Sequence, residues 1–201
     1  MPILLHVGCG QKRKDQTTRG FRDAAWREVR LDIDPAVEPD VVGTMTDMSA
    51  VADGSVDALF SSHNIEHLYP YEVEIALAEF ARVLRPEGFA IITCPDLQSV
   101  AALVAQDRLL DTAYDSPAGP IAPIDMIYGH RPALAEGNHY MAHRCGFTLK
   151  VLRAVLQGSG FPEVAGVARP EFFDLWVATS KSLPRAALRD LAAAHFPEGS
   201  V

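Results

Sequence analysis

The chain has 201 residues, of which 48% are hydrophobic and 22% are charged, and its formal net charge is -8 at pH 7. This length and composition fit one globular domain with a full core, and they exclude a disordered or fibrous chain. Binding to nucleic acid requires clustered cations against the phosphates, and the sequence has no long basic stripe. We therefore expect a small molecule as the partner and no nucleic acid.

Hydropathy and cysteine usage bear on the location of the protein. No run of 18 apolar residues occurs without a charge or a turn residue, so we expect no membrane span. The sequence starts with the strand-like residues 1–7 (MPILLHV), which lack the basic stretch and apolar segment of a signal peptide. Cys9, Cys94 and Cys145 are an odd number with no CxxC pair. These features predict a cytoplasmic protein.

The N-terminal half alternates short apolar runs with turns. Four runs predict strands, at residues 3–7, 29–33, 41–42 and 55–62. Residues 71–84 have apolar side chains at i, i+3, i+4 and i+7 with glutamates between them, which predicts an amphipathic helix. Residues 85–88 (RPEG) would end that helix in a turn, and residues 89–94 would form the next strand.

The C-terminal half begins with a segment that fits neither the helical nor the strand period. Residues 97–146 contain the turn-rich stretch 116–125 and are too long for a simple connection, so we predict a lid inserted over the sheet edge. Residues 148–158 predict a helix, and residues 172–180 a last strand. A helical pattern at 183–196 either covers the sheet or pairs with a second subunit, which leaves a homodimer open. The whole pattern predicts a single α/β domain that binds its ligand beyond the carboxyl ends of the strands.

Glycines and carboxylates follow the first three predicted strands. The segment Gly8-Cys9-Gly10 lets the backbone approach a ligand closely. Asp32 ends the second strand about twenty residues later, where a carboxylate can accept hydrogen bonds from a ribose diol. Asp47 and Met48 follow the third strand and could receive the amino group and the face of an adenine ring. Taken alone, each of these segments is also typical of a turn.

Five segments in order resemble the motifs of a known family. They are HVGCG, LDID, TDM, SVDALFSSHNIEHL and FARVLRPEGFAIITCPD. In order and spacing they resemble class I S-adenosylmethionine-dependent methyltransferases, in particular the small-molecule group that includes ubiquinone and menaquinone C-methylases. The resemblance covers about residues 3–95, with a weaker echo in LQGSGF at 156–161. It implies a Rossmann-like seven-stranded, mostly parallel sheet with flanking helices and an antiparallel last strand.

The resemblance also implies a site for S-adenosylmethionine, with S-adenosylhomocysteine as the product. Gly8 and Gly10 would lie against the methionine moiety, Asp32 on the ribose, and Asp47 with Met48 on the adenine. The full expected set is His6, Gly8, Cys9, Gly10, Asp32, Ile33, Asp47, Met48, Ser62 and His63. The family usually has an acidic residue at the position of His6 and a glycine at that of Lys12. His6 could instead orient the loop or bind the cofactor carboxylate.

Methyl transfer requires alignment, exclusion of water and, for an oxygen or nitrogen acceptor, a base. Histidine is the natural base near neutral pH, and the candidates are His63, His67, His139 and His143. Glu66-His67 could instead buttress the loop by hydrogen bonds. The lid residues expected to recognise the acceptor are Tyr128, His130, His139, Tyr140, His143 and Arg144.

A metal site receives little support from the sequence. His139 and His143 have the spacing of two ligands on one helical face, and Asp125 or Glu136 could complete such a site. There is neither a CxxC pair nor an HExxH pattern, so we predict no metal.

The sequence therefore predicts an enzyme that moves a methyl group to an oxygen, nitrogen or carbon atom of a small molecule bound under the 97–146 lid. Two alternatives stay open. A degenerate methyltransferase fold could act as a binding or regulatory module, which His6 and Lys12 motivate. An NAD(P)-dependent oxidoreductase is the other, although Arg13 stands where its GxGxxG motif requires the third glycine.

Overall fold

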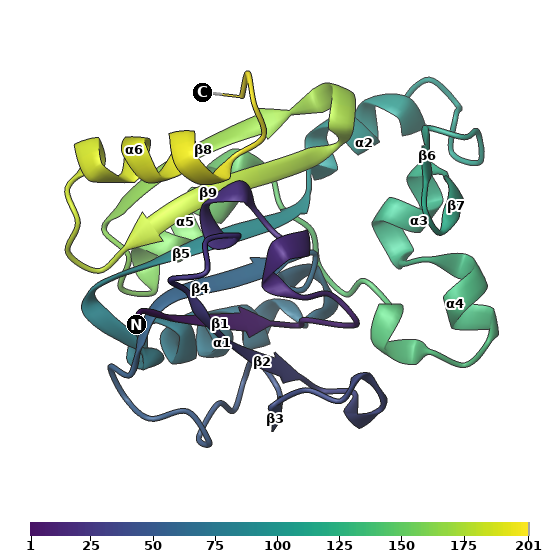
Figure 1. The fold of residues 1–201 in the computed structure, drawn as a ribbon. Coiled ribbons are helices and arrows are strands. Elements are labelled where there is room, and N and C mark those ends of the chain that lie inside the picture. The colour runs from purple at the N-terminus through teal and green to yellow at the C-terminus, as the bar shows by residue number, and fades with distance from the viewer. Residues whose placement is uncertain (201) are drawn as a thin grey trace.

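The computed structural model describes residues 1–200. Its main feature is one seven-stranded sheet with the order β3-β2-β1-β4-β5-β9-β8 (Figure 1). The strands are β1 (Ile3–Val7), β2 (Arg27–Asp32), β3 (Val41–Val42), β4 (Val56–Ser62), β5 (Leu84–Pro95), β8 (Glu163–Arg169) and β9 (Asp174–Ser180). Strands β1 to β5 are parallel, and β9 is antiparallel to both of its neighbours. The expected mostly parallel sheet with an antiparallel last strand is confirmed.

Helices and turns cover both faces of this sheet. On one face, α1 (Pro70–Val83) and α5 (Leu149–Gly158) contribute buried leucines and valines to the larger core. On the other face, α6 (Arg185–His195) and the 3-10 turn η2 (Arg19–Phe21) pack Ala192 and Phe21 against β4 and β5. Burying a large apolar side chain contributes roughly 1.5–3 kcal/mol, so these two layers hold the sheet together. Of the two roles considered for the C-terminal helix, covering the sheet is the one observed.

The connection between β1 and β2 contains no α-helix, and the structure describes all of it. Two 3-10 turns take its place, η1 (Lys14–Gln16) and η2. A further 3-10 turn, η3 (Pro35–Val37), joins β2 to β3. Thr18 Oγ1 lies 2.6 Å from His195 Nδ1, and Phe21 is fully buried, so this basic segment is anchored to α6. This face of the sheet is therefore covered by α6 and η2.

The start of β5 differs from the expected turn at residues 85–88. Helix α1 ends at Val83 and β5 begins at Leu84, which pairs with Val56. The next pair joins Phe89 to Ala58, so residues 85–88 leave the ladder as a bulge. Pro86 has no N–H to donate to a ladder, which explains why the irregularity lies there.

The lid segment, residues 97–146, has a structure of its own beyond the carboxyl ends of β1 and β4 (Figure 1). It consists of α2 (Leu97–Val104), the hairpin of β6 (Tyr114–Ser116) and β7 (Gly119–Ile121), α3 (Pro123–Tyr128), α4 (Arg131–Ala135) and the 3-10 turn η5 (His139–Met141). Val100, Ile121 and Met126 form a small separate core. The buried Asp125 pairs with Arg131 at 2.6 Å, which holds α3 to α4. Over residues 1–200, every helix is too short or too polar to cross a bilayer.

The packing of α6 on η2 predicts a pH dependence of stability through His195. This ring is buried 4.2 Å from the ring centroid of Phe21. Burial, with a smaller effect from the charge of Arg19, lowers the pKa of His195 to about 4 from 6.5. The folded form thus binds this proton less well than the unfolded chain. Neutral His195 contributes fully to the free energy of unfolding above pH 6.5. As the pH falls from 6.5 to 4, the protein loses about 3 kcal/mol of this free energy.

Urea unfolding between pH 4 and 7 measures this loss. The control is His195→Gln, which keeps a hydrogen-bonding group for Thr18 but does not titrate. We expect its stability to fall less than that of the unmodified chain over the same range. Parallel curves for the two proteins would contradict the role assigned to His195.

Candidate functional site

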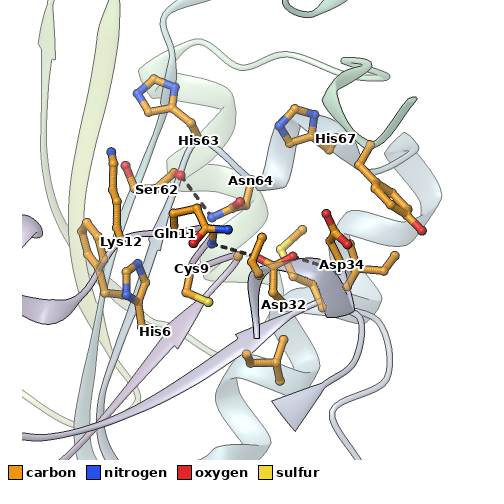
Figure 2. A pocket seen from close by; sticks show the side chains of 18 of the residues that line it. His6, Cys9, Gln11, Lys12, Asp32, Asp34, Ser62, His63, Asn64 and His67 are labelled. Atoms are coloured by element: carbon orange, nitrogen blue, oxygen red, sulfur yellow. Dashed lines mark hydrogen bonds between the residues drawn. The ribbon is translucent and has the colours of Figure 1, made fainter. Parts of the chain in front are cut away.

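A cavity of about 650 Å³ opens at the carboxyl ends of β1, β2 and β4 (Figure 2). The sheet edge lines it with His6, Gly8, Cys9, Gly10, Asp32, Ile33, Ser62 and His63, and the lid segment adds Asn138, Tyr140, Met141 and Arg144. This is the edge where an open α/β sheet binds its ligands, and the volume is typical of a small-molecule site. Eight of the expected cofactor residues therefore line one cavity.

The loop after β1 is built on two glycines with different surroundings. Gly8 and Gly10 have φ angles of +61° and +51°, in the left-handed region that favours glycine. A Cβ on Gly8 would lie 2.1 Å from Asn64 Oδ1, whereas a Cβ on Gly10 would meet nothing within 4 Å. Packing thus requires glycine at position 8, while Gly10 leaves open space beside the cavity.

Asp32 is tied to this loop by its carboxylate. The backbone N–H of Gly10 donates to Oδ2 at 2.8 Å, and that of Asp34 donates to Oδ1 at 3.0 Å (Figure 2). The residue is 9% exposed and lines the cavity. Each carboxylate oxygen has a second lone pair, so Asp32 can still accept hydrogen bonds from a ligand with two adjacent hydroxyl groups.

Arg30 supports the same loop, and the sequence analysis missed it. Its side chain is buried, and Nη1 donates to the carbonyl of Glu38 at 2.8 Å. Its Nη2 donates to the carbonyls of Gly10 and Val37. The guanidinium thereby links the glycine loop to η3. A cation inside the apolar run VRLDI was the signal that could have revealed it.

His6 and Cys9 lie on the cavity side of β1. His6 is 2% exposed, and its Nδ1 lies 2.9 Å from Glu28 Oε1. Burial lowers the pKa of His6, although Glu28 opposes this effect. Burial raises the pKa of the Cys9 thiol to about 11. Cys9 is therefore an uncharged thiol, and His6 belongs to a buried pair whose partner is Glu28.

Asp47 and Met48 lie outside the cavity lining, in contrast to the expected adenine contact. Met48 is buried in the core, its N–H donates to Glu79 at 2.7 Å, and its carbonyl accepts from Arg82 at 2.9 Å. Asp47 accepts the N–H of Ser49 in a local turn. Because α1 holds this loop through Glu79 and Arg82, the residues that reach the cavity come earlier, and they are Gly43, Thr44 and Met45.

A group of polar residues lies across the cavity from His6 and Asp32, where Figure 2 shows His63 and His67. His63 has a φ of +56°, and its Nδ1 lies 3.5 Å from Oε1 of Glu66, in the 3-10 turn η4 (Ile65–His67). Partial burial disfavours charge on His63, but the nearby carboxylate of Glu66 raises its pKa. Burial also opposes ionisation of Glu66, yet the histidines around it lower its pKa.

The other candidate histidines separate into two groups. His143 Nδ1 lies 2.9 Å from the Met126 carbonyl, and its ring centroid lies 4.8 Å from that of His67. Burial lowers the pKa of His143. His139 is exposed on η5, which ends at Met141, so it does not share a helical face with His143.

The remaining lid candidates divide between two cavities. Tyr140 and Arg144 line the main cavity. Tyr128 instead lines a second cavity of about 230 Å³, together with Glu66 and His143. His130, which directly precedes α4, lines neither of the two.

Comparisons with known proteins give a family match and a shared fold. Residues 5–92 match the family model described as a methyltransferase domain. That match spans β1 to β5 and includes Gly8, Asp32 and His63. No curated protein matches the sequence closely enough to serve as a relative.

Solved structures share the fold at low sequence identity. A protein of Pyrococcus horikoshii OT3 superposes with a TM-score of 0.58 at 15% identity, over 90% of this chain and 82% of its own. The 1,6-didemethyltoxoflavin-N1-methyltransferase of Burkholderia thailandensis, crystallised with 1,6-didemethyltoxoflavin and S-adenosylhomocysteine, gives 0.55 at 16%, over 90% and 72%. A Thermotoga maritima S-adenosylmethionine-dependent methyltransferase, a possible histamine N-methyltransferase, gives 0.58 at 14%, over 90% and 83%. The chain has the class I methyltransferase fold.

The different surroundings of the two glycines predict different costs of substitution. Gly10→Ala adds only the strain of a left-handed residue, roughly 1–2 kcal/mol in the free energy of unfolding. Gly8→Ala adds the same strain and also displaces Asn64, whose buried hydrogen bonds are worth about 1–3 kcal/mol more. Denaturant unfolding of both variants measures the difference. Equal destabilisation would show that Asn64 does not constrain Gly8.

Proposed function

Residues 5–92 match a methyltransferase-domain family model, and the chain has the class I methyltransferase fold. From these findings we propose that this protein is an S-adenosylmethionine-dependent methyltransferase that acts on a small molecule. The observation that carries the proposal is the cavity at the ends of β1, β2 and β4, where Gly10 and Asp32 meet. The acceptor atom would be oxygen, nitrogen or carbon.

The residues around the cavity fit the cofactor. S-adenosylmethionine supplies a methyl group already activated on a sulfonium, so the protein has to bind and orient its reactants. The open space beside Gly10 suits an approach of the methionine moiety to the backbone. The carboxylate of Asp32, which accepts the N–H groups of Gly10 and Asp34, would also accept hydrogen bonds from the ribose hydroxyls. Ile33, Val37 and Met45 line the cavity with apolar surface suitable for the adenine ring.

The lid side of the cavity provides the proposed acceptor site. Tyr140 and Arg144 would contact the acceptor, and the lid segment would exclude water from it. Among the catalytic candidates, His63 and His67 line the cavity, so these two would receive a proton from an oxygen or nitrogen acceptor. His139 and His143 do not line it. For a carbon acceptor that loses no proton before transfer, neither His63 nor His67 would be needed as a base.

The second candidate function is a binding or regulatory module on the same fold. The observation that favours it is the buried His6–Glu28 pair, which stands where the resembling family has an acidic residue. Such a module would bind the cofactor without turnover. An acceptor screen that follows the formation of S-adenosylhomocysteine separates the two functions, because only the enzyme forms it.

We expect S-adenosylhomocysteine to bind to the purified protein, and Asp32→Ala to weaken this binding about 10- to 100-fold, as for the loss of hydrogen bonds to a charged group. Asp47→Asn is the matched control, since this carboxylate lies outside the cavity and the amide keeps the local turn. Its dissociation constant should stay within about twofold of the unmodified value. Calorimetric titration measures all three proteins, and circular dichroism confirms that each is folded.

Two results would count against the proposal. If neither S-adenosylmethionine nor S-adenosylhomocysteine bound, the cavity would not be a cofactor site. If NADH or NADPH bound instead, and Asp32→Ala weakened that binding, the oxidoreductase alternative would replace the proposal.

A further inference from the structure

A buried carboxylate without a hydrogen-bond donor lies between the two cavities. Glu66 is 1% exposed, and within residues 1–200 neither of its carboxylate oxygens has a hydrogen-bond partner. His63 Nδ1 comes within 3.5 Å of Oε1, which is longer than an ordinary hydrogen bond. Removing a carboxylate from water is costly, and proteins compensate by pairing the charge or by metal coordination. His63 approaches only Oε1, so Glu66 has room for a further partner.

Two histidines beside Glu66 have their ring orientations fixed by backbone carbonyls. His67 Nδ1 lies 3.1 Å from the carbonyl of Ala142, and His143 Nδ1 lies 2.9 Å from that of Met126. A carbonyl only accepts hydrogen bonds, so both rings carry a proton on Nδ1. Each neutral ring therefore has an unprotonated Nε2. A ring N–H donated to a carbonyl, with the other nitrogen bare, is the usual arrangement of a metal-binding histidine.

The three side chains converge. One potential ligand atom from each of Glu66, His67 and His143 lies within 4.8 Å of the other two. The backbone holds them together, because the N–H groups of Arg144 and Cys145 both donate to the carbonyl of Glu66. Ligand atoms about 2.1 Å from a bound ion lie roughly 3–4 Å from one another. Rotation of the Glu66 side chain, together with small shifts of the two rings, would bring the three atoms to these distances.

We propose that Glu66, His67 and His143 bind one divalent ion of a first-row transition metal, such as zinc, manganese or cobalt. Two imidazole nitrogens and one carboxylate oxygen suit these ions, whereas calcium and magnesium prefer oxygen ligands alone. Three protein ligands leave at least one coordination position open. His67 lines the main cavity, while Glu66 and His143 line the second, so the ion would lie in the wall between them.

This site differs from the one considered in the sequence. The His139-x3-His143 spacing relied on a helical face that the structure does not form. The fold instead brings His143 to a pair of residues 76 and 77 positions earlier in the chain. The proposal does not depend on methyl transfer, since the ligands are positioned without the cofactor. A metal ion on Nε2 of His67 would leave His63 as the ring that receives a proton from an acceptor.

Metal binding to the untagged, chelator-treated protein tests the proposal. The probes are Zn²⁺, Mn²⁺ and Co²⁺, each added without S-adenosylmethionine. We expect one ion per chain by elemental mass spectrometry after desalting, a rise in Tm, and a visible absorption band of bound Co²⁺. Glu66→Gln should weaken binding at least about 100-fold, because it removes the anionic ligand while keeping the shape of the side chain.

Two further variants make the result decisive. His139→Ala, at an exposed histidine on the same segment, should bind the metal as the unmodified chain does. His143→Gln provides a second ligand variant if Glu66→Gln does not fold. The proposal would be overturned if none of the three ions bound at one per chain, or if binding persisted in both Glu66→Gln and His143→Gln. Because no measurement includes the cofactor, either failure leaves the proposed methyltransferase function untouched.

Discussion

The Asn64 side chain holds the carboxyl ends of β1 and β4 together, and the geometry of the cavity depends on that contact. Its amide nitrogen donates to the carbonyl of Val7 at 2.9 Å and to that of Ser62 at 3.1 Å. The same side chain occupies the space in which Gly8 would otherwise carry a Cβ. Only glycine fits at position 8, where the backbone has a positive φ angle, and after this turn the N–H of Gly10 donates to Asp32. One amide thus determines where two strands end and where a ligand can approach the backbone.

The segment that follows β4 connects the floor of the cavity to the lid. His63 adopts a left-handed conformation directly after the strand, which costs energy for a residue with a side chain. Three residues later, the carbonyl of Glu66 accepts two N–H groups from the end of the lid segment. The strand edge and the lid are therefore joined by backbone hydrogen bonds. The lid side of the cavity is built on that junction.

Local patterns in the sequence predicted the elements but not every side-chain position. Helix α1 was predictable because its apolar positions follow the helical period, and Asp32 because it is a carboxylate at the carboxyl end of a strand. Met48 has no such local determinant. Its backbone is hydrogen-bonded to Glu79 and Arg82 of α1, and these contacts hold it in the core. The carbonyls that bind Arg30 lie in irregular backbone, and the N–H groups that bind the Glu66 carbonyl come from the distant end of the lid segment. Periodicity reports which face of an element is buried, whereas these contacts depend on how separate elements meet.

The absence of an α-helix between β1 and β2 has a consequence for the order in which the site forms. The 3-10 segment that replaces it supplies Gln16 and Thr17 to the cavity wall, and Arg19 binds the carbonyls of Ala193 and Ala194 at the end of α6. These contacts join positions more than 170 residues apart. During synthesis, β1 and β2 leave the ribosome long before α6 does. The cavity wall beside the glycine loop therefore acquires its support from α6 only after α6 has emerged from the ribosome.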